Sequence, residues 1–384
     1  MPLEIGTARV EITPKSPCHL AGYGSRNKPH EGVHDALNLR ALYARGSDGG
    51  EGLLLAADLL GFGPELDARI RETLSRELKL DPQRIFLAGT HTHSAPVYGG
   101  ENVNAEWRAG VEARALAAAG VARSRLAPVT LHEGRSSCAI GLNRRQVQPD
   151  GSITLGHNPE GPADRELILV EARDAAGRVV AQLSNYACHG VVLGPKNYQI
   201  SGDWCGVATQ RLEAGLDGGA ALFLNGGCGN IDPKVRVQGS FEPVEALALE
   251  YIASVEAARK EAKALSGSEK VNAVELDVHL PHKARKVEDG DGQTRKVPLR
   301  GLRLGPLCLV GYPGEMFCET AMAVKNKSPH AHTMAVNYID AYYYGYVPVK
   351  EAYATGGYEV RVSPYSEAAE AVLRQGLLDV AAKL

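Results

Sequence analysis

Short runs of apolar residues recur along the chain at lengths typical of β-strands. Three of them lie at residues 52–57, 220–225 and 307–311, and the segment 84–89 has the same character. Because these runs are continuous rather than alternating, they indicate strands that are covered on both faces. Between the predicted strands 52–57 and 84–89 the spacing becomes helical, with an apolar stripe formed by Leu66, Ile70, Leu74 and Leu78. The order strand, helix, strand predicts a parallel pair.

The alternation of element types continues to the end of the chain. Helical patterns cover residues 107–126, 243–265 and 367–384, and strand patterns cover 129–140, 167–171, 179–186, 274–280 and 334–338. A turn at 174–177 joins two of these strands as a pair. The charged stretch within residues 282–298 is expected to be an exposed loop. The pattern predicts an α/β protein without internal repeats.

Composition indicates an ordinary globular protein. The 384 residues are 44% hydrophobic and 23% charged, and this length fits either two average domains or one large domain. The net charge is -3, and no basic run is interleaved with aromatic residues, so we expect a small-molecule substrate and no nucleic acid partner. No signal-peptide pattern or membrane-spanning run is present. We therefore expect a cytoplasmic protein without a membrane partner. The sequence leaves open whether the protein forms a homo-oligomer.

The seven cysteines are scattered and odd in number, and none forms a Cys-x-x-Cys pair. This spacing argues against a disulfide framework and against a structural zinc knuckle. Reduced thiols are typical of a cytosolic enzyme.

Polar residues follow the predicted strands where each strand ends. They are Asp58, the pair His91 and His93, His189, and the loop 225–232. In α/β sheets, reactive groups gather outside the carboxyl ends of strands. The sequence therefore predicts one site at which these residues converge.

His91 and His93 lie two residues apart, so both imidazoles share one face if the strand continues through them. A chain with 12 histidines in 384 residues contains a His-x-His pattern about 0.4 times by chance, so the spacing alone is weak evidence. The alternative is a pair of surface or hydrogen-bonded histidines. The position at a strand end favours a role in binding a metal or a substrate.

Two further residues could act as metal ligands. His189 is followed by Gly190, which lets the chain turn away and the ring enter the same cleft. Glu315 follows a Pro-Gly turn directly after an apolar strand. The alternatives are a core histidine with satisfied hydrogen bonds and a glutamate favoured by a helix dipole.

A glycine-rich loop and a tyrosine-rich segment add candidates. The loop 224–233 could present backbone amides to a substrate oxygen, and Cys228 at its centre could be a nucleophile or merely a buried thiol in a tight turn. The segment 338–348 holds five of the chain's 15 tyrosines within nine residues. Such clusters line a pocket or an interface, and a phenolate can also bind zinc.

Motifs spread over nearly the whole chain form an ordered set. They are residues 6–14, 20–24, 32–35, 90–96, 143–144, 189–190, 201–203, 226–233, 313–315, 343–348 and 356–359. Together they resemble the catalytic domain of the neutral/alkaline (non-lysosomal) ceramidase family. The resemblance implies one large α/β domain over residues 1–384, with mixed multi-stranded sheets and covering helices.

The resemblance also implies a zinc site and a division of roles. It assigns the ion to His91, His189, Glu315 and a tyrosine, with Tyr343 preferred over Tyr346. His93 and Arg144 would face the substrate. The remaining expected roles are proton delivery or oxyanion binding by His93, Tyr353 or Tyr358, substrate contacts by Asn225, Gly227, Gly229, Asn230 and Tyr346, and metal contact or ligand support by Asp58 and Asp203.

The family hydrolyses an amide, with zinc polarising the carbonyl and activating water. Ceramidases carry a serine in the loop where this chain has Cys228 or Gly229, so the thiol could replace a hydroxyl. We expect a protein without the family's immunoglobulin-like domain and secretion signal, and the sequence has only five phenylalanines and two tryptophans. A small soluble amide, or an N-acylated amine or sugar, is therefore the expected substrate.

Three other hypotheses remain open at this stage. The first is a zinc enzyme that cleaves an ester, lactone or glycosidic bond. The second is a relative without catalytic activity that binds a polar ligand in the same cleft. The third is a hydrolase that depends on Cys228.

Overall fold

The computed structural model describes residues 2–283, 293–342 and 344–384, and three larger β-sheets organise this part of the chain. The first sheet has the order β5 (Ile85–Gly89), β4 (Glu51–Ala57), β3 (Asn38–Arg45), β1 (Glu4–Glu11), β6 (Ala127–Pro128). The second has the order β13 (Ala220–Asn225), β11 (Val179–Tyr186), β10 (Glu166–Arg173), β7 (Thr130–Ser137), β15 (Lys263–Ala264). The third has the order β16 (Val271–Pro281), β17 (Thr294–Leu304), β18 (Leu307–Gly311), β20 (Thr333–Val336).

Smaller sheets and the helices complete the described part. The short sheets are β14 (Ile231–Pro233) with β8 (Gly141–Val147) and β9 (Ile153–Asn158), β12 (Gln199–Ile200) with β2 (Gly32–Val33), and β19 (Glu315–Met316) with β21 (Tyr346–Val347). The helices are α1 (Pro64–Leu78), α2 (Ala105–Ser124), α3 (Asp203–Ala214), α4 (Glu242–Lys260), α5 (Cys318–Lys327), α6 (Lys350–Thr355), α7 (Tyr358–Val362) and α8 (Ala369–Lys383), with a 3-10 turn at Pro82–Arg84. Within the described residues, no helix is both long and apolar enough to cross a membrane.

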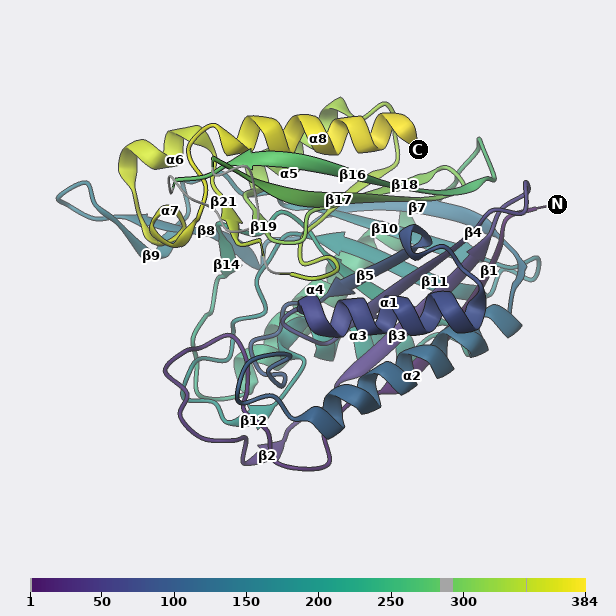
Figure 1. Cartoon of the computed structure of the whole chain (residues 1–384), viewed down its shortest axis with the longest axis horizontal. Coiled ribbons are helices and arrows are strands. Elements are labelled where there is room, and N and C mark those ends of the chain that lie inside the picture. Colours follow the sequence, from purple (N-terminus) through teal and green to yellow (C-terminus); the bar gives the residue numbers. More distant parts are fainter. Residues whose placement is uncertain (1, 284–292, 343) are drawn as a thin grey trace.

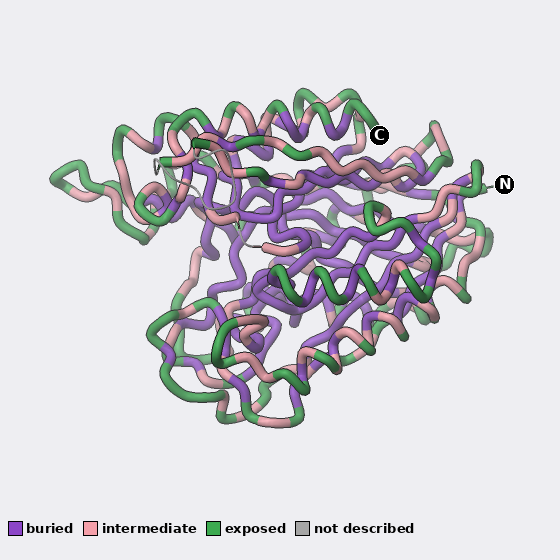
Figure 2. The backbone as a smooth tube through the Cα atoms, viewed as in Figure 1, coloured by how far each residue is buried: buried purple, intermediate pink, exposed green. Residues whose placement is uncertain are grey.

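The three larger sheets share one central apolar core, and helices cover their outer faces (Figure 1). In β4, Leu54 and Ala56 point into this core, whereas Leu53 and Leu55 pack towards α1 and α2. Helices α3 and α4 cover the second sheet in the same way, and α5 and α8 cover the third. Strands β4, β5, β13 and β18 are therefore buried almost throughout, and the helices keep an exposed stripe (Figure 2). This two-sided burial explains the continuous apolar runs in the sequence.

The predicted α/β class with mixed sheets and covering helices is confirmed, and so are most of the predicted elements. Strands β4 and β5 are parallel and joined through α1, and β10 and β11 are antiparallel neighbours. The predicted helix 243–265 is too long, because the chain leaves α4 at Lys260 and forms the edge strand β15 beside β7.

The predicted exposed loop 282–298 is also shorter than expected. Residues 294–298 belong to β17, which pairs along its length with β16. The charged residues suggested a loop, but in this strand they lie next to buried side chains. Val297 is fully buried, whereas the neighbouring Lys296 is exposed. The rest of that loop, residues 284–292, lies outside the described residues.

The carboxyl ends of the first two sheets are tied together by Asn225, the last residue of β13. Its side-chain amide donates to the carbonyl of Thr90 (3.2 Å) and to the carbonyl of Cys188 (3.0 Å), and its Oδ1 accepts from the Cys188 amide (3.2 Å). A bridge between Thr92 and Gly190 continues the contact. The segments that carry the predicted histidines are thereby held side by side.

Candidate metal centre and substrate pocket

His91 owes its orientation to a left-handed turn rather than to a strand. Strand β5 ends at Gly89, and His91 has a φ of 68°, which is uncommon for a residue other than glycine. Its Nδ1 lies 2.8 Å from the Leu60 carbonyl, and its ring stacks on Tyr338 at 3.6 Å. With the Nδ1 proton donated to that carbonyl, Nε2 presents a lone pair to the site. The expected continuation of the strand through both histidines is wrong, yet the imidazoles still meet.

His189 is held in the same manner from the second sheet. Its Nδ1 lies 3.0 Å from the Ile231 carbonyl, so Nε2 points away towards Glu315. Its Nε2 lies 3.1 Å from Glu315 Oε2. The Nε2 atom of His93 lies 3.2 Å from that of His91, and one ring nitrogen from each of the three histidines falls within 4.8 Å of the others. Three imidazoles from two sheets thus converge on one point.

Glu315 supplies a carboxylate to this cluster from the short strand β19. Its Oε2 lies 3.9 Å from His91 Nε2, while its Oε1 accepts a hydrogen bond from Tyr342 Oη (2.7 Å). Tyr338 Oη also reaches it, donating to Oε2 at 3.3 Å. Tyr343, the preferred tyrosine ligand, lies outside the described residues. The sequence pointed to the tyrosine-rich segment but missed Tyr338 and Tyr342, both of which have a positive φ that composition does not reveal.

Burial and mutual charge give the cluster unusual pKa values. Burial lowers the pKa of His91 to about 3, although Glu315 opposes this effect. Burial alone would raise the pKa of Glu315, but contacts with His189 and His91 lower it to about 2. Burial disfavours the charged form of His189, yet Cys228 and Glu315 outweigh it and raise its pKa to about 10. Glu315 is therefore ionised, and positive charge beside it is favoured.

The donor atoms fit a divalent cation of the zinc type. Imidazole nitrogens and carboxylate oxygens bind zinc at ~2.0–2.2 Å in a tetrahedron, which places neighbouring donors roughly 3.3 Å apart. The separations of 3.2 Å between His93 and His91, and of 3.1 Å between His189 and Glu315, match this geometry. His93 was expected only to face the substrate, but its Nε2 lies as close to His91 as a further ligand would.

Arg144 lies beside the cluster on β8 and is held by two carboxylates. Its Nη1 donates to Asp232 Oδ1 (3.0 Å) and its Nε donates to Glu359 Oε1 (2.8 Å). The same Nη1 lies 3.3 Å from His189 Nε2, and Nη2 donates to Tyr346 Oη (3.1 Å). The guanidinium is buried and fixed next to the donor atoms, as expected for a group that meets substrate. Asp232 and Glu359 were not singled out, although both lie inside quoted motifs.

The glycine-rich loop does not present its residues to a substrate as predicted. A Cβ on Gly227 would lie 2.5 Å from the Ala321 side chain, and the amide of Gly229 donates to the Met316 carbonyl (3.0 Å). Asn230 binds the Cys318 amide (3.0 Å) through its side chain. These residues are used for close packing of the loop against β19 and α5, and Asn225 ties the sheets together as described above. The physical reason for the difference is that the small side chains admit neighbouring backbone rather than a ligand.

Cys228 in this loop is fully buried, and its Sγ lies 2.9 Å from Tyr338 Oη. It touches the cluster through that phenol and also interacts with His189. This placement within a tightly packed loop favours the alternative of a buried thiol in a tight turn over that of a nucleophile.

The two predicted supporting aspartates have different places. Asp203 accepts hydrogen bonds from the amides of Leu193 (3.0 Å) and Trp204 (2.7 Å), so it fixes the turn that follows His189. Asp58 instead pairs with buried Arg40 (3.1 Å) beneath the first sheet. Asp203 supports a ligand-bearing segment, whereas Asp58 stabilises the sheet.

The two tyrosines proposed for proton delivery have different positions. Tyr353 donates its hydroxyl to the carbonyl of Tyr365, between α7 and α8 (2.9 Å), and is not among the residues that line the pocket at the cluster. Tyr358 lines the pocket beside Arg144, whose Cζ lies 5.9 Å from its ring centroid.

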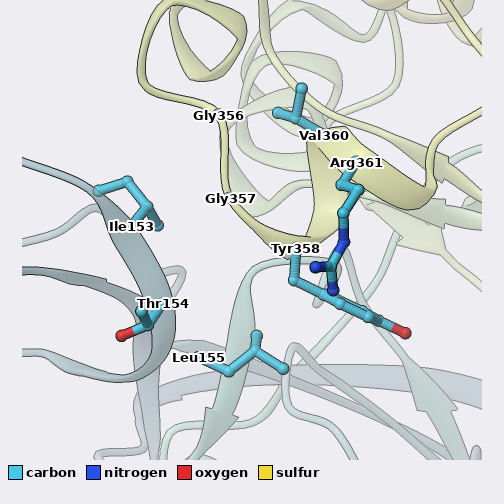
Figure 3. Close-up of a pocket in the computed structure, with 8 residues that line it drawn as sticks. All are labelled: Ile153, Thr154, Leu155, Gly356, Gly357, Tyr358, Val360 and Arg361. Carbon is cyan, nitrogen blue, oxygen red and sulfur yellow. The ribbon is translucent and has the colours of Figure 1, made fainter.

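A pocket of about 300 Å³ opens directly onto the cluster. Its polar lining includes Tyr23, His93, Arg144, Asp232, Arg236 and Tyr358. A second hollow of about 530 Å³ adjoins it between β9 and α7, and the two share Leu155 and Tyr358 (Figure 3). The two hollows therefore meet at Leu155 and Tyr358.

The described residues form an α/β fold with a buried cluster of histidines and a carboxylate, and comparisons with known proteins support the fold. No protein-family model matches the sequence. The curated neutral ceramidase of Pseudomonas aeruginosa is 24% identical over 263 residues, which span 64% of this chain but only 39% of that protein.

Solved structures show the same likeness. The crystal structure of neutral ceramidase from Pseudomonas aeruginosa matches with a TM-score of 0.83 at 19% identity, covering 99% of this chain and 74% of that one. A ceramidase complexed with C2 matches equally well, at a TM-score of 0.83 and 18% identity over 99% of this chain and 75% of that one. The chain shares the fold of neutral ceramidase, and the fold expected from the motifs is confirmed.

Proposed function

We propose that the protein is a zinc-dependent hydrolase that cleaves an amide bond in a small N-acylated substrate. The observation that carries this proposal is the meeting of three imidazole nitrogens and the Glu315 carboxylate in a buried cluster at the floor of a polar pocket. The similarity to neutral ceramidase supports the choice of an amide. The ion would be held by His91, His189 and Glu315, with a phenol of Tyr338 or Tyr342 beside them.

Zinc bound there would polarise a carbonyl and lower the pKa of water, so that attack can occur near neutral pH. Arg144 supplies a fixed positive charge next to the position of the carbonyl oxygen, because Asp232 and Glu359 hold its guanidinium in place. Such preorganised charge stabilises an oxyanion without reorganisation.

Oxyanion binding and proton transfer fall to residues on the pocket wall. Burial and the neighbouring imidazoles lower the pKa of His93 well below its usual value, so His93 is neutral and its ring N–H can donate a hydrogen bond to the oxyanion. Burial raises the pKa of Tyr358, so that its phenol keeps its proton and can donate it to a leaving amine.

A panel of matched amides, esters and glycosides, assayed with zinc-loaded protein, tests this proposal. We expect turnover of the amides, a loss of at least about 100-fold in kcat/KM for His189→Ala, and retained turnover for Cys228→Ser. Cleavage of only esters or glycosides would assign a different bond. Activity that survives removal of zinc but not Cys228→Ser would contradict the proposal.

A further inference from the structure

The charged residues around the pocket indicate which charge the substrate carries. This inference rests on the proposed amide hydrolysis. Two carboxylates, Asp232 and Glu359, connect three guanidinium groups in one network. Arg144 bridges both carboxylates, Arg145 pairs with Glu359 (2.8 Å), and Arg236 pairs with Asp232 (2.6 Å). The network therefore carries a net positive charge before any metal is counted. A substrate with a negative group is favoured at such a site.

Arg236 is the member of this network that is free to meet a ligand. Arg144 and Arg145 are buried and bind several protein acceptors, whereas the Arg236 side chain is 21% exposed and lines the pocket. Only its Nε is committed, to Asp232 Oδ2. Within the described part of the chain, no hydrogen bond is assigned to its two Nη atoms.

Asp232 also prepares the Arg236 guanidinium for binding. Asp232 is buried and accepts from Arg144 on one oxygen and from Arg236 on the other, so both of its oxygens are engaged by guanidinium groups. The ion pair holds the guanidinium across the pocket. An arginine fixed in this way presents two parallel N–H donors, which match the two oxygens of a carboxylate.

The opposite wall adds a second source of positive charge. Arg26 is buried, and its guanidinium lies over the Tyr23 ring, 4.9 Å from the centroid. It binds the backbone carbonyls of Ala21 and His93 rather than a carboxylate. Its charge is therefore not neutralised by a direct partner among the described residues, and it lies beside the same pocket.

Arg236 and the histidine cluster face the same pocket of about 300 Å³, because Arg236, His93 and His189 all line it. One ligand in this pocket can therefore contact Arg236 and the cluster at the same time. We infer that the substrate is a small N-acyl amide that bears a carboxylate a few atoms from the scissile bond, and that Arg236 binds this carboxylate.

Non-hydrolysable ketones test the inference separately from catalysis. In 4-oxoheptanoate a methylene replaces the amide nitrogen of N-butanoylglycine, and 4-oxoheptanamide is its neutral match. With zinc-loaded protein in calorimetry, we expect the carboxylate to bind roughly 10- to 100-fold more tightly, as is typical of a hydrogen bond to a charged group. Equal affinity for the two ketones would overturn the inference.

Variants identify the residue responsible. Arg236→Gln should reduce the affinity ratio to about one, and Arg236→Lys should keep only part of it, because an ammonium lacks the fork. Arg178→Gln is the matched control, since Arg178 also pairs with an aspartate four residues earlier but lies in an exposed turn. A ratio that persists in Arg236→Gln, or that falls equally in Arg178→Gln, would refute the assignment to Arg236.

Turnover of N-butanoylglycine and N-butanoylglycinamide is measured in parallel. Hydrolysis of both at equal kcat/KM would support the proposed amide hydrolysis and contradict the anionic substrate. Hydrolysis of neither, together with tighter binding of the keto acid, would contradict the proposed reaction while supporting the carboxylate site.

Discussion

Glu359 offers a sharp test of how the pocket is built. It is fully buried on α7, and its two oxygens accept from Arg144 Nε and Arg145 Nη1, both at 2.8 Å. Glu359→Gln keeps the volume but removes the charge that balances two buried guanidinium groups. Removing one partner of a buried ion pair costs about 3–5 kcal/mol.

The expected change in melting temperature follows from the length of the chain. At ~2.1 cal/mol/K per residue, 384 residues give an unfolding entropy of about 0.8 kcal/mol/K. The loss above then lowers the Tm by about 4–6 °C, measured by calorimetry or circular dichroism. Because Arg144 also loses its fixed position, kcat/KM should fall by roughly 10- to 100-fold, in line with the cost of a small misplacement.

Glu213→Gln separates stability from positioning. Glu213 is likewise buried between two arginines, accepting from Arg9 Nη1 (3.0 Å) and Arg40 Nε (3.4 Å), but it lies on α3 and does not line the substrate pocket. The Glu213→Gln variant should lower the Tm by a similar amount and leave kcat/KM nearly unchanged. If both variants lose stability and neither loses activity, Glu359 does not position Arg144 for catalysis, and the reasoning is refuted.

Three further predictions concern the surroundings of the cluster. Gly22→Ala should lower kcat/KM at least about tenfold, because a Cβ there would lie 2.4 Å from the His93 ring and Gly22 has a φ of 90°; normal kinetics would contradict this. Tyr342→Phe removes the hydrogen bond to Glu315 and should weaken zinc binding by roughly 10- to 100-fold in a chelator competition, whereas unchanged affinity would exclude that support. Burial raises the pKa of Asp203 from 3.8 to about 6, so the folded state binds the proton more tightly than the unfolded state and loses stability as the pH rises from about 4 to 6. At 1.36 kcal/mol per pH unit, the free energy of unfolding of the wild type should fall by roughly 2 kcal/mol relative to Asp203→Asn between pH 4 and 7, and a constant difference in urea titrations would refute it.

The sequence predicted the framework well because two-sided burial leaves a direct signature. The apolar runs at β4, β13 and β18 are strands, and the stripe from Leu66 to Leu78 is α1. The pattern failed where neighbours decide the outcome. The β15 edge pairs with β7, and the charged residues of β17 lie between buried ones, and neither contact is visible in local periodicity.

In the site, too, local sequence patterns predicted some features, whereas contacts with distant segments decided others. His91, His189 and Glu315 could be proposed because each follows a strand whose end the sequence predicts. The left-handed backbone at His91 and at Tyr338 could not, because it depends on hydrogen bonds to distant segments. The glycine loop was misread for a related reason. Glycines that admit a ligand and glycines that admit a neighbouring strand have the same sequence signature.

The central claim is that one divalent cation is bound by His91, His189 and Glu315, and the stoichiometry and affinity of zinc test it most directly. After equilibrium dialysis and elemental analysis, the wild type should contain about one zinc per chain, with a higher Tm in the presence of zinc. His91→Ala and His189→Ala should each retain less than about a tenth of that amount. His279→Ala, which removes an exposed histidine on β16, should bind zinc like the wild type. Less than about half an equivalent in the wild type after incubation with zinc, or full occupancy in the His91 and His189 variants, would contradict the account.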